Sequence, residues 1–363
     1  MTKNIKIGII TDEIFYRGHV PPYPKPSFLS YENPLRIRRI MDYFDSINLF
    51  QVKNIKKIIP IQINKNDLKL AHSDYHIEII EWMSRKGGSI LNEEVFIDID
   101  TFQIAKRAVA GAISTLSSVI NDEVNVSFGL IRPPGHHASR EQASGFCIFN
   151  NIANAILYLR KKLNYDKKIA IIDIDDHYGD GLAKFFYEDP NVLYCSIHEY
   201  NFSEPEPGFL DEIGAKEGKG FNINFPVPEG IDDKIFLYVI DFFEKIINEF
   251  NPGLIIVAIG FDGYFDDPVG NMFLTSQGYY SFTKKILRLS NRIKDCKLAF
   301  ILEGGYSLIG LPYCVHAVLK ALFNQYYDKL EFERFLSIDE SLFQTIKKIE
   351  NRLKNLLAFK WNF

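Results

Sequence analysis

The 363-residue sequence predicts an α/β fold in which helices cover both faces of a mostly parallel β-sheet. Short apolar runs rich in β-branched residues recur along the chain, and segments with helical spacing separate them. The runs are almost continuously apolar, which is typical of strands that are covered on both faces in a parallel sheet. We therefore expect a doubly wound sheet with right-handed crossovers.

The predicted strands are, in chain order, 6–11, 126–133, 168–175, 192–198, 221–227, 254–262 and 298–305. Helical spacing is clearest in 102–120 and 236–250. The sequence has no internal repeat and no low-complexity linker, so we expect one domain over residues 1–363. The Pro-rich segment 19–34 is expected to form a long structured loop, and 330–363 a helical extension.

Composition and charge narrow the class of protein. Hydrophobic residues make up 47% of the sequence and charged residues 24%, with a net charge of −4. The sequence contains no basic block of the kind that would indicate a nucleic-acid partner. It also contains no apolar run that is long enough to span a membrane. The N-terminus lacks the features of a secretory signal, and the cysteines lie far apart, at Cys147, Cys195, Cys296 and Cys314. These features predict reduced thiols in a cytoplasmic protein.

Polar and titratable side chains follow four of the predicted strands. The segments "RPPGHH", "DIDDH", "GFD" and "EGGY" each begin where an apolar run ends. In open α/β sheets, ligands bind outside the carboxyl ends of the strands. Four strand ends that carry such groups therefore favour a functional site at that edge of the sheet.

A metal site is one interpretation of "DIDDHYGDG". Asp175 and His177 are two residues apart, so extended backbone directs both side chains to one side, and Asp173 lies deeper. Asp262 follows another strand and adds a third donor. One imidazole and two carboxylates leave a coordination position for water, as in catalytic zinc sites, and they also suit Fe(II), Co(II) or Mn(II). Helix capping, surface ion pairs and an ordinary turn at Asp262 are the alternatives.

The tandem histidines His136 and His137 lie in a loop shaped by glycine and proline. Imidazole is suited to proton transfer near neutral pH, and each ring needs a partner on its other nitrogen to fix its tautomer. Asp173 and Asp180 are the expected partners. The alternative is a turn with two solvent-exposed imidazoles.

Taken together, the motifs of this sequence resemble those of the zinc-dependent deacetylase superfamily, which includes histone deacetylases and acetylpolyamine amidohydrolases. The motifs are "RPPGHHAS", "GFCIFNN", "DIDDHYGDG", "SIH", "GKGFNINFP", "GFDGYFDDPVG" and "LEGGYS", and the resemblance runs from about Tyr31 to about His316. It implies a three-layer α/β/α fold of the arginase/deacetylase type, with a mostly parallel central sheet of about eight strands. The segments 19–34 and 85–101 would form the rim of the active site.

The resemblance also implies a role for individual residues. The zinc ligands would be Asp175, His177 and Asp262. The catalytic residues would be the acid–base pair His136 and His137, oriented by Asp173 and Asp180, and the oxyanion donor Tyr306. A structural potassium ion would be held by Asp173, Asp175, His177, Ser196 and Ile197. The substrate would be contacted by Phe146, Gly145, Glu94, Glu93, Glu206, Gly304 and Arg36. Cys147 is interpreted as a packing residue beside the site.

The implied reaction is hydrolysis of an acetamide by metal-activated water. The sequence departs from the family pattern at Tyr178, at Asp176 and at Glu206, where relatives often carry histidine, an apolar residue and an aromatic residue respectively. Acidic residues near the entrance favour a polycation, so we expect a small acetylated amine, above all an acetylpolyamine. A protein or peptide acetyl-lysine deacetylase is the alternative. A homodimer is possible, and the sequence does not fix the oligomeric state.

Two hypotheses from other functional classes have less support from the sequence. An arginase-like ureohydrolase would need further aspartate ligands for a second metal ion, and the two metal-ligand segments do not provide them. A non-catalytic binding module would be expected to have lost part of the catalytic set, whereas every member of that set is present.

Overall fold

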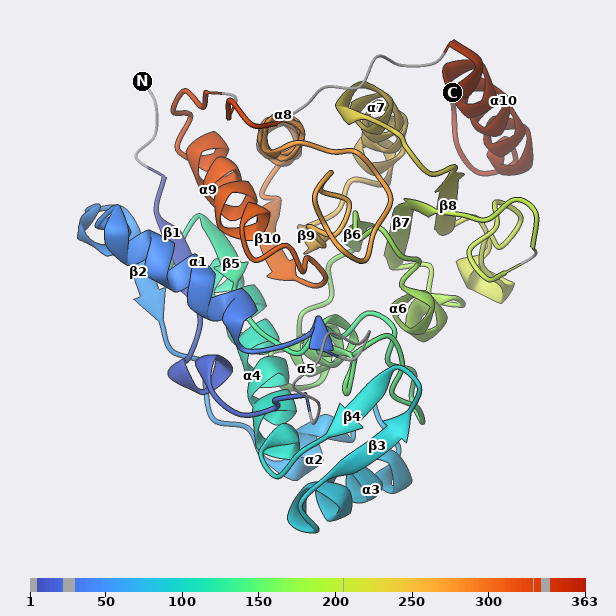
Figure 1. The fold of residues 1–363 in the computed structure, drawn as a ribbon. Coiled ribbons are helices and arrows are strands. Elements are labelled where there is room, and N and C mark those ends of the chain that lie inside the picture. Colours follow the sequence, from blue (N-terminus) through green and yellow to red (C-terminus); the bar gives the residue numbers. More distant parts are fainter. Residues whose placement is uncertain (1–4, 22–29, 205, 329, 334–339) are drawn as a thin grey trace. The chain divides into compact units, whose positions relative to one another are not determined.

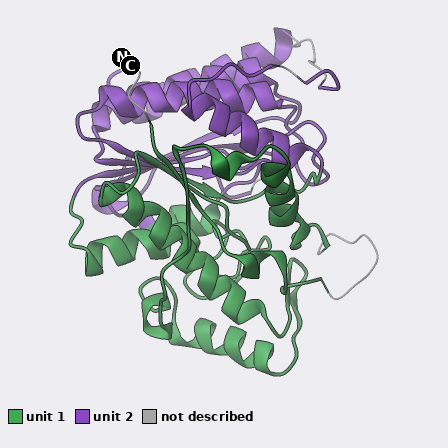
Figure 2. Cartoon of the chain, turned by 90° about the vertical axis from the view of Figure 1, so that its left-hand side faces the viewer, with its two compact units in different colours: residues 1–166, 179–185, 299–308 green, residues 167–178, 186–298, 309–363 purple. Residues whose placement is uncertain are grey.

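The computed structural model describes residues 5–21, 30–204, 206–328, 330–333 and 340–363. The chain divides into two compact units, each assembled from separate stretches of sequence (Figure 2). Unit 1 comprises Met1–Asp166, Gly179–Phe185 and Ala299–Leu308. Unit 2 comprises Lys167–Tyr178, Phe186–Leu298 and Ile309–Phe363. Parts of the predicted loop 19–34 and of the extension 330–363 lie outside the described residues, and the single domain stays a prediction.

Unit 1 contains strands in the order β2-β1-β5-β10 (Figure 1). Their bounds are β1 Ile7–Ile10, β2 Ile55–Ile58, β5 Val126–Gly129 and β10 Lys297–Leu302, of which the last four residues belong to this unit. β1 pairs in parallel with both β2 and β5. Every residue of β1 and β5 is buried, as the continuous apolar runs predict. An antiparallel hairpin joins β3 (Ser89–Asn92) to β4 (Val95–Ile97).

The helices of unit 1 include a long one that approaches the segment after β5 closely at a glycine. They are α1 Leu35–Ser46, α2 Lys65–Leu68, α3 Asp74–Arg85, α4 Thr101–Ile120, α5 Asn151–Lys162 and α6 Asp180–Phe186, with 3-10 turns at Glu13–Tyr16 and Leu49–Gln51. In α4, a Cβ added to Gly111 would lie 2.5 Å from the Ile131 side chain. The side chain of Asn150 caps α5 by accepting from Ala153 N–H (2.9 Å).

Unit 2 contains parallel strands in the order β9-β6-β7-β8. Their bounds are β6 Ile169–Asp173, β7 Val192–Glu199, β8 Asn222–Val227 and β9 Leu254–Ile259. β6 and β9 are neighbours, with Asp173 opposite Ala258. The segments that follow these two strands therefore leave the sheet side by side, which places the residues after Asp173 close to those after Ile259.

The helices of unit 2 are α7 Asp233–Phe250, α8 Ser276–Arg292, α9 Gly310–Leu322 and α10 Glu340–Leu357. α7 begins at the cap Asp232, whose side chain accepts from two N–H groups, and buries an apolar face that includes Phe242 and Phe243. The C-terminal helix α10 packs on α7 and β8. Beyond it, Trp361 lies among the aromatic rings of the same unit and donates from Nε1 to Gly220 O (2.7 Å).

The predicted α/β class is confirmed. Each unit contains four neighbouring strands of the main sheet order, β2-β1-β5-β10 in unit 1 and β9-β6-β7-β8 in unit 2. All seven predicted strands are present within a few residues of their expected bounds, and the two clearest helical segments form α4 and α7. The eighth strand, β2, was not predicted, since its sequence "IKKI" carries two exposed lysines and shows no apolar run.

Candidate active site

Three predicted metal ligands converge at the carboxyl ends of β6 and β9 in unit 2. His177 Nδ1 lies 3.2 Å from Asp175 Oδ1 and 3.1 Å from Asp262 Oδ2. Donor atoms on a tetrahedral zinc ion with bonds near 2.0–2.1 Å lie about 3.3 Å apart, so this spacing suits one ion. The Asp175 and Asp262 side chains are each 1% exposed, whereas His177 is 41% exposed. The set is thus buried on its carboxylate side and open on its imidazole side.

The backbone around the three donors is shaped to bring them together. Asp175 lies two residues beyond the end of β6, and its side chain accepts from His177 N–H (3.0 Å). Gly260 faces Asp175, and a Cβ there would lie 2.2 Å from Asp175 Oδ2. Any larger residue would displace the carboxylate, so glycine is required at this close approach.

The electrostatics of the set call for a cation. Burial, reinforced by the Asp175 charge, raises the pKa of Asp262 to about 7. Burial opposes protonation of His177, yet the two carboxylates outweigh it and raise the pKa of that imidazole well above its usual value. Two carboxylates that face each other in a buried site are costly unless a positive charge lies between them. Zn²⁺, or Fe²⁺ or Co²⁺, would supply that charge through donors of a suitable chemical type.

Asp176 links the ligand segment to its surroundings. Its backbone N–H donates to Asp262 Oδ1 (3.0 Å), and its carboxylate accepts from Asn271 N–H (2.9 Å) and Met272 N–H (3.3 Å). The Asn271 side chain in turn donates to Glu199 (2.9 Å). The sequence showed Asp176 only as a departure from the family pattern. In the structure it holds the loop after β9 against the predicted ligand Asp262.

The residues expected to bind potassium lie at the ends of β6 and β7. Asp173 and Ser196 are paired across these strands, and Ile197 follows. Asp173 Oδ2 accepts from Tyr194 O–H (2.9 Å), and Ser196 Oγ lies 2.8 Å from His198 Nδ1. Tyr178, the second departure, packs against His198 with ring centroids 4.8 Å apart. The potassium site stays a prediction.

The tandem histidines lie in unit 1, in the loop that follows β5. Their ring centroids are 4.1 Å apart, and His137 Nδ1 lies 3.2 Å from Asp180 Oδ1, as predicted for that pair. Asp180 also accepts from Lys184 (3.1 Å). Burial raises the pKa of Asp180, but His137 and Lys184 outweigh this and lower it, so the carboxylate is ionised beside the imidazole.

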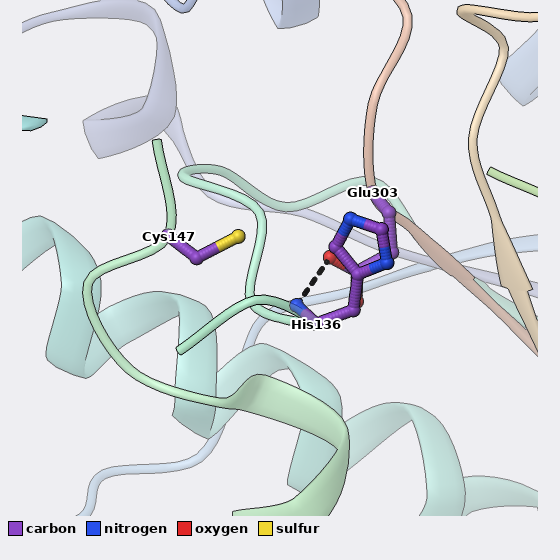
Figure 3. A group of neighbouring side chains, drawn as sticks. All are labelled: His136, Cys147 and Glu303. Atoms are coloured by element: carbon purple, nitrogen blue, oxygen red, sulfur yellow. Dashed lines mark hydrogen bonds between the residues drawn. The ribbon is translucent and has the colours of Figure 1, made fainter. Parts of the chain in front are cut away.

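Glu303, at the end of β10, fixes the backbone of the histidine loop. Its Oε2 accepts from His136 N–H (3.1 Å; Figure 3) and from Gly135 N–H (2.6 Å). The residue is fully buried. The sequence motif "LEGGYS" contains this residue, but no role was predicted for it. The missed signal was an acidic residue at the end of an otherwise apolar strand.

A tight turn presents Phe146 beside Tyr306. Ser144 and Cys147 exchange two backbone hydrogen bonds (3.1 and 2.8 Å), and both residues between them have positive φ, +51° at Gly145 and +64° at Phe146. This pattern is that of a two-residue hairpin turn. The Phe146 and Tyr306 rings meet edge to face with centroids 5.3 Å apart. A Cβ added to Gly145 would lie 2.2 Å from the His137 ring.

Glu94 reaches this turn from the loop between β3 and β4. Its Oε2 accepts from Ser144 Oγ–H (2.7 Å) and Gly145 N–H (2.8 Å). Burial raises the pKa of Glu94, but these two hydrogen bonds outweigh it and lower the pKa. Glu94 therefore holds the turn that carries Phe146, a contact that the sequence did not indicate.

The predicted residue Arg36 lies under the Tyr306 loop. Its guanidinium donates to Gly305 O (2.7 Å) and Glu303 O (2.5 Å), on either side of Gly304, and lies 4.6 Å from the Tyr306 ring centroid. Two further buried residues complete this group: Glu32 accepts from Arg36 (3.2 Å) and from Arg132 (2.7 and 2.8 Å). Its pKa falls to about 2, because the Arg132 charge outweighs burial.

The other predicted substrate residues are exposed. Glu93 lies next to Glu94 in the same loop of unit 1. Glu206 lies in unit 2 and accepts through Oε1 from Asn201 N–H (2.9 Å), so it closes its own loop. The structure thus groups His136, His137, Asp180, Phe146, Gly145, Glu94, Arg36, Gly304 and Tyr306 in unit 1, and it groups Asp173, Asp175, His177, Ser196, Ile197 and Asp262 in unit 2. The roles of these residues stay predictions.

Comparison with known proteins matches this chain to proteins that are named deacetylases or amidohydrolases. The histone deacetylase domain model matches residues 30–322. A probable deacetylase from Archaeoglobus fulgidus is 33% identical over 316 residues, which cover 86% of each chain. A histone deacetylase-like amidohydrolase from Pseudomonas aeruginosa is 31% identical over 80% of this chain and 76% of its own length. The polyamine deacetylase HDAC10 from Danio rerio is 34% identical over 72% of this chain and 41% of its own length.

The crystal structure of the HDA15 HD domain matches with a TM-score of 0.85 and 26% identity over 98% of this chain and 97% of that one. This likeness supports the predicted three-layer fold class. Among the described residues, no helix has the length and apolar character needed to cross a bilayer.

Proposed function

The chain belongs to the histone deacetylase family, and we propose that it removes acetyl groups from acetylated amines, with acetylpolyamines as the substrate class. The observation that carries the chemistry is the arrangement of Asp175, His177 and Asp262, whose donor atoms have the spacing of a single tetrahedral ion. When bound there, the metal ion would lower the pKa of a water molecule and polarise the acetyl carbonyl.

The chain's own groups would move the protons. Asp180 holds the Nδ1 side of His137, which leaves Nε2 to take a proton from the attacking water and to return it to the departing amine. His136 is the second acid–base group. Tyr306 would donate its hydroxyl proton as a hydrogen bond to the acetyl oxygen as negative charge develops there. Phe146 would form an apolar wall for the carbon chain of the substrate.

Two observations favour a polyamine as the amine. One relative that covers most of this chain is named a polyamine deacetylase. Acidic side chains also lie in the loop between β3 and β4, where Glu93 and Glu94 would attract a polycation through long-range charge. Other relatives are named histone deacetylases, so a peptide acetyl-lysine substrate is the second candidate.

The test is a comparison of kcat/KM for acetylputrescine, acetylspermidine and an acetyl-lysine peptide on enzyme of measured metal content. We expect one zinc, iron or cobalt ion per chain and at least about a tenfold preference for an acetylpolyamine, since a few charged contacts each contribute up to about 1 kcal/mol. A preference for the peptide would overturn the polyamine assignment and leave the chemistry in place. Metal-loaded enzyme without turnover on any of the three would contradict the deacetylase itself.

Three finer assignments belong to the same proposal. Asp173, Ser196 and Ile197 would contribute to a potassium site, which is supported by the pairing of β6 with β7. All four cysteines are thiols outside any disulfide, which supports the predicted cytoplasmic location. A homodimer is the third, and it is an expectation carried over from the family resemblance of the sequence.

A further inference from the structure

Unit 1 contains a group of three side chains with metal-ligating donor atoms, distinct in its residues from the Asp175, His177 and Asp262 set. His136, Cys147 and Glu303 are all buried and place one donor atom each within 4.8 Å of the others. Figure 3 shows the Cys147 sulfur directed toward the other two side chains. We propose that this group binds a second, thiophilic divalent cation, Zn²⁺ in excess or Cd²⁺, and that its occupancy inhibits the enzyme. The inhibition rests on the proposed function, and the binding does not.

The three donors come from three segments that are each held in place. Glu303 follows β10 and is fixed by the two N–H groups that its Oε2 accepts. His136 lies in the segment that carries those N–H groups. Cys147 closes the tight turn that begins at Ser144, and Glu94 anchors that turn from the outside. The donors are therefore gathered before any ion arrives, which lowers the entropic cost of binding.

The donor types decide which ions this site would take. One sulfur, one imidazole nitrogen and one carboxylate oxygen form a mixed set of the kind that binds zinc. The thiol would release its proton to solvent as the metal–sulfur bond forms, so binding would strengthen as the pH rises. The set formed by Asp175, His177 and Asp262 contains no sulfur. Cd²⁺ would therefore favour the His136 group over the other, because thiolate is the softer ligand.

Occupation would remove a group that the proposed reaction needs. An imidazole nitrogen of His136 that binds a metal ion cannot exchange a proton with substrate or water. Cys147 has no part in the proposed reaction, and its loss should spare turnover while it removes the inhibition. A change at Cys147 therefore separates metal inhibition at this site from metal competition at the Asp175 group.

The experiment uses the full chain loaded with one equivalent of zinc. Cd²⁺ is added while the thiolate-to-cadmium absorption band and acetylpolyamine turnover are recorded in parallel. We expect the band to grow with the next equivalent and turnover to fall at least about tenfold at saturation. Cys147→Ala and Cys147→Ser should lose the band and keep turnover at the same Cd²⁺ concentration. Cys296→Ser, which removes the partly exposed thiol, should behave as the unmodified chain.

An absorption band in Cys147→Ala equal to that of the unmodified chain would overturn the site, as would an unchanged inhibition curve in that variant. X-ray absorption of the Cd²⁺-loaded unmodified chain provides a test that needs no substitution. A sulfur neighbour of cadmium is expected, and a shell of nitrogen and oxygen alone would overturn the proposal. If the chain has no deacetylase activity, the band and the sulfur neighbour still report on the site by themselves.

Discussion

Asp176 shows how one residue outside the predicted ligand set can hold that set in place. Its carboxylate accepts hydrogen bonds from two backbone N–H groups of the loop after β9, while its own N–H donates to the predicted ligand Asp262. Gly270 packs against the same two residues, and a Cβ added there would lie 2.3 Å from Asp262 O and 2.7 Å from Asp176 Oδ2. Hydrogen bonds and close packing thus fix Asp176, Asp262 and the loop after β9 relative to one another.

Asp176→Ala should weaken metal binding. It leaves the N–H groups of Asn271 and Met272 without their acceptor, at a cost of about 1–3 kcal/mol for each buried group. We expect about a 10- to 100-fold loss of zinc affinity, as is usual when a supporting residue is removed. Competition between the metal-free chain and a chromogenic chelator would measure it. Asp211→Ala, at an exposed site in the same unit, is the matched control. Equal affinities in the two variants would contradict the role.

Tyr306 can be tested with little change in packing. Its ring is held by Phe146 and by the Arg36 guanidinium, and phenylalanine would keep both contacts. If the hydroxyl stabilises charge on the acetyl oxygen, Tyr306→Phe should lower kcat by about 10²- to 10³-fold and leave KM within a few-fold. Steady-state kinetics would measure this, beside the control Tyr326→Phe at an exposed position. Full activity in Tyr306→Phe would remove the residue from the proposed reaction.

The sequence indicated the candidate site residues, whose roles stay predictions, but it did not indicate the contacts that support them. The donors after β6 and β9 were predictable, because parallel strands bring their carboxyl ends to one edge. Glu303 was not, because its contact with His136 joins residues 167 positions apart. That contact depends on β10 lying next to β5, and a single sequence does not reveal strand order.

At the scale of elements, the β3–β4 hairpin supports the turn from Ser144 to Cys147. The hairpin is short, and its β3 residues are mostly exposed, so apolar periodicity did not reveal it. Its contribution comes through Glu94, which accepts from both Ser144 and Gly145. The positive φ of Phe146 is unfavourable for a bulky residue and needs such surrounding support.

Glu94→Ala and Glu93→Ala separate two roles for this hairpin. If Glu94 holds the turn, its loss should raise KM or lower kcat by a similar factor for every acetylated substrate, by about tenfold for two lost charge-assisted hydrogen bonds. If both residues only attract positive charge, the two variants should lose affinity for polyamines alike and spare neutral substrates. The comparison needs kinetics with acetylspermidine and a neutral acetamide. Equal effects of the two changes would contradict the holding role.

At the scale of the whole molecule, buried histidines link stability to pH. Burial lowers the pKa of His72 and of His198 to about 3, and it lowers that of His19 to about 4 although Glu32 opposes it. The unfolded chain binds protons at these groups near pH 6.5, whereas the folded chain does not. Asp176 and Asp233 act in the opposite direction, because burial raises their pKa to about 8 and about 6.

Burial also lowers the pKa of His76 and of His316, and it raises that of Asp262. Five histidines against three aspartates give a net loss of stability as the pH falls from about 6.5 toward 4. His72→Gln isolates one of them, since glutamine can accept the Asn150 N–H that His72 Nε2 now accepts (2.9 Å) and does not titrate. The slope of unfolding free energy against pH should decrease by about 1.4 kcal/mol per pH unit in this window, which corresponds to one proton. Urea unfolding at several pH values and constant zinc would measure both slopes. Metal release contributes equally to the two proteins, so it cancels in the difference. Parallel slopes would show that the folded chain protonates His72 as readily as the unfolded chain does.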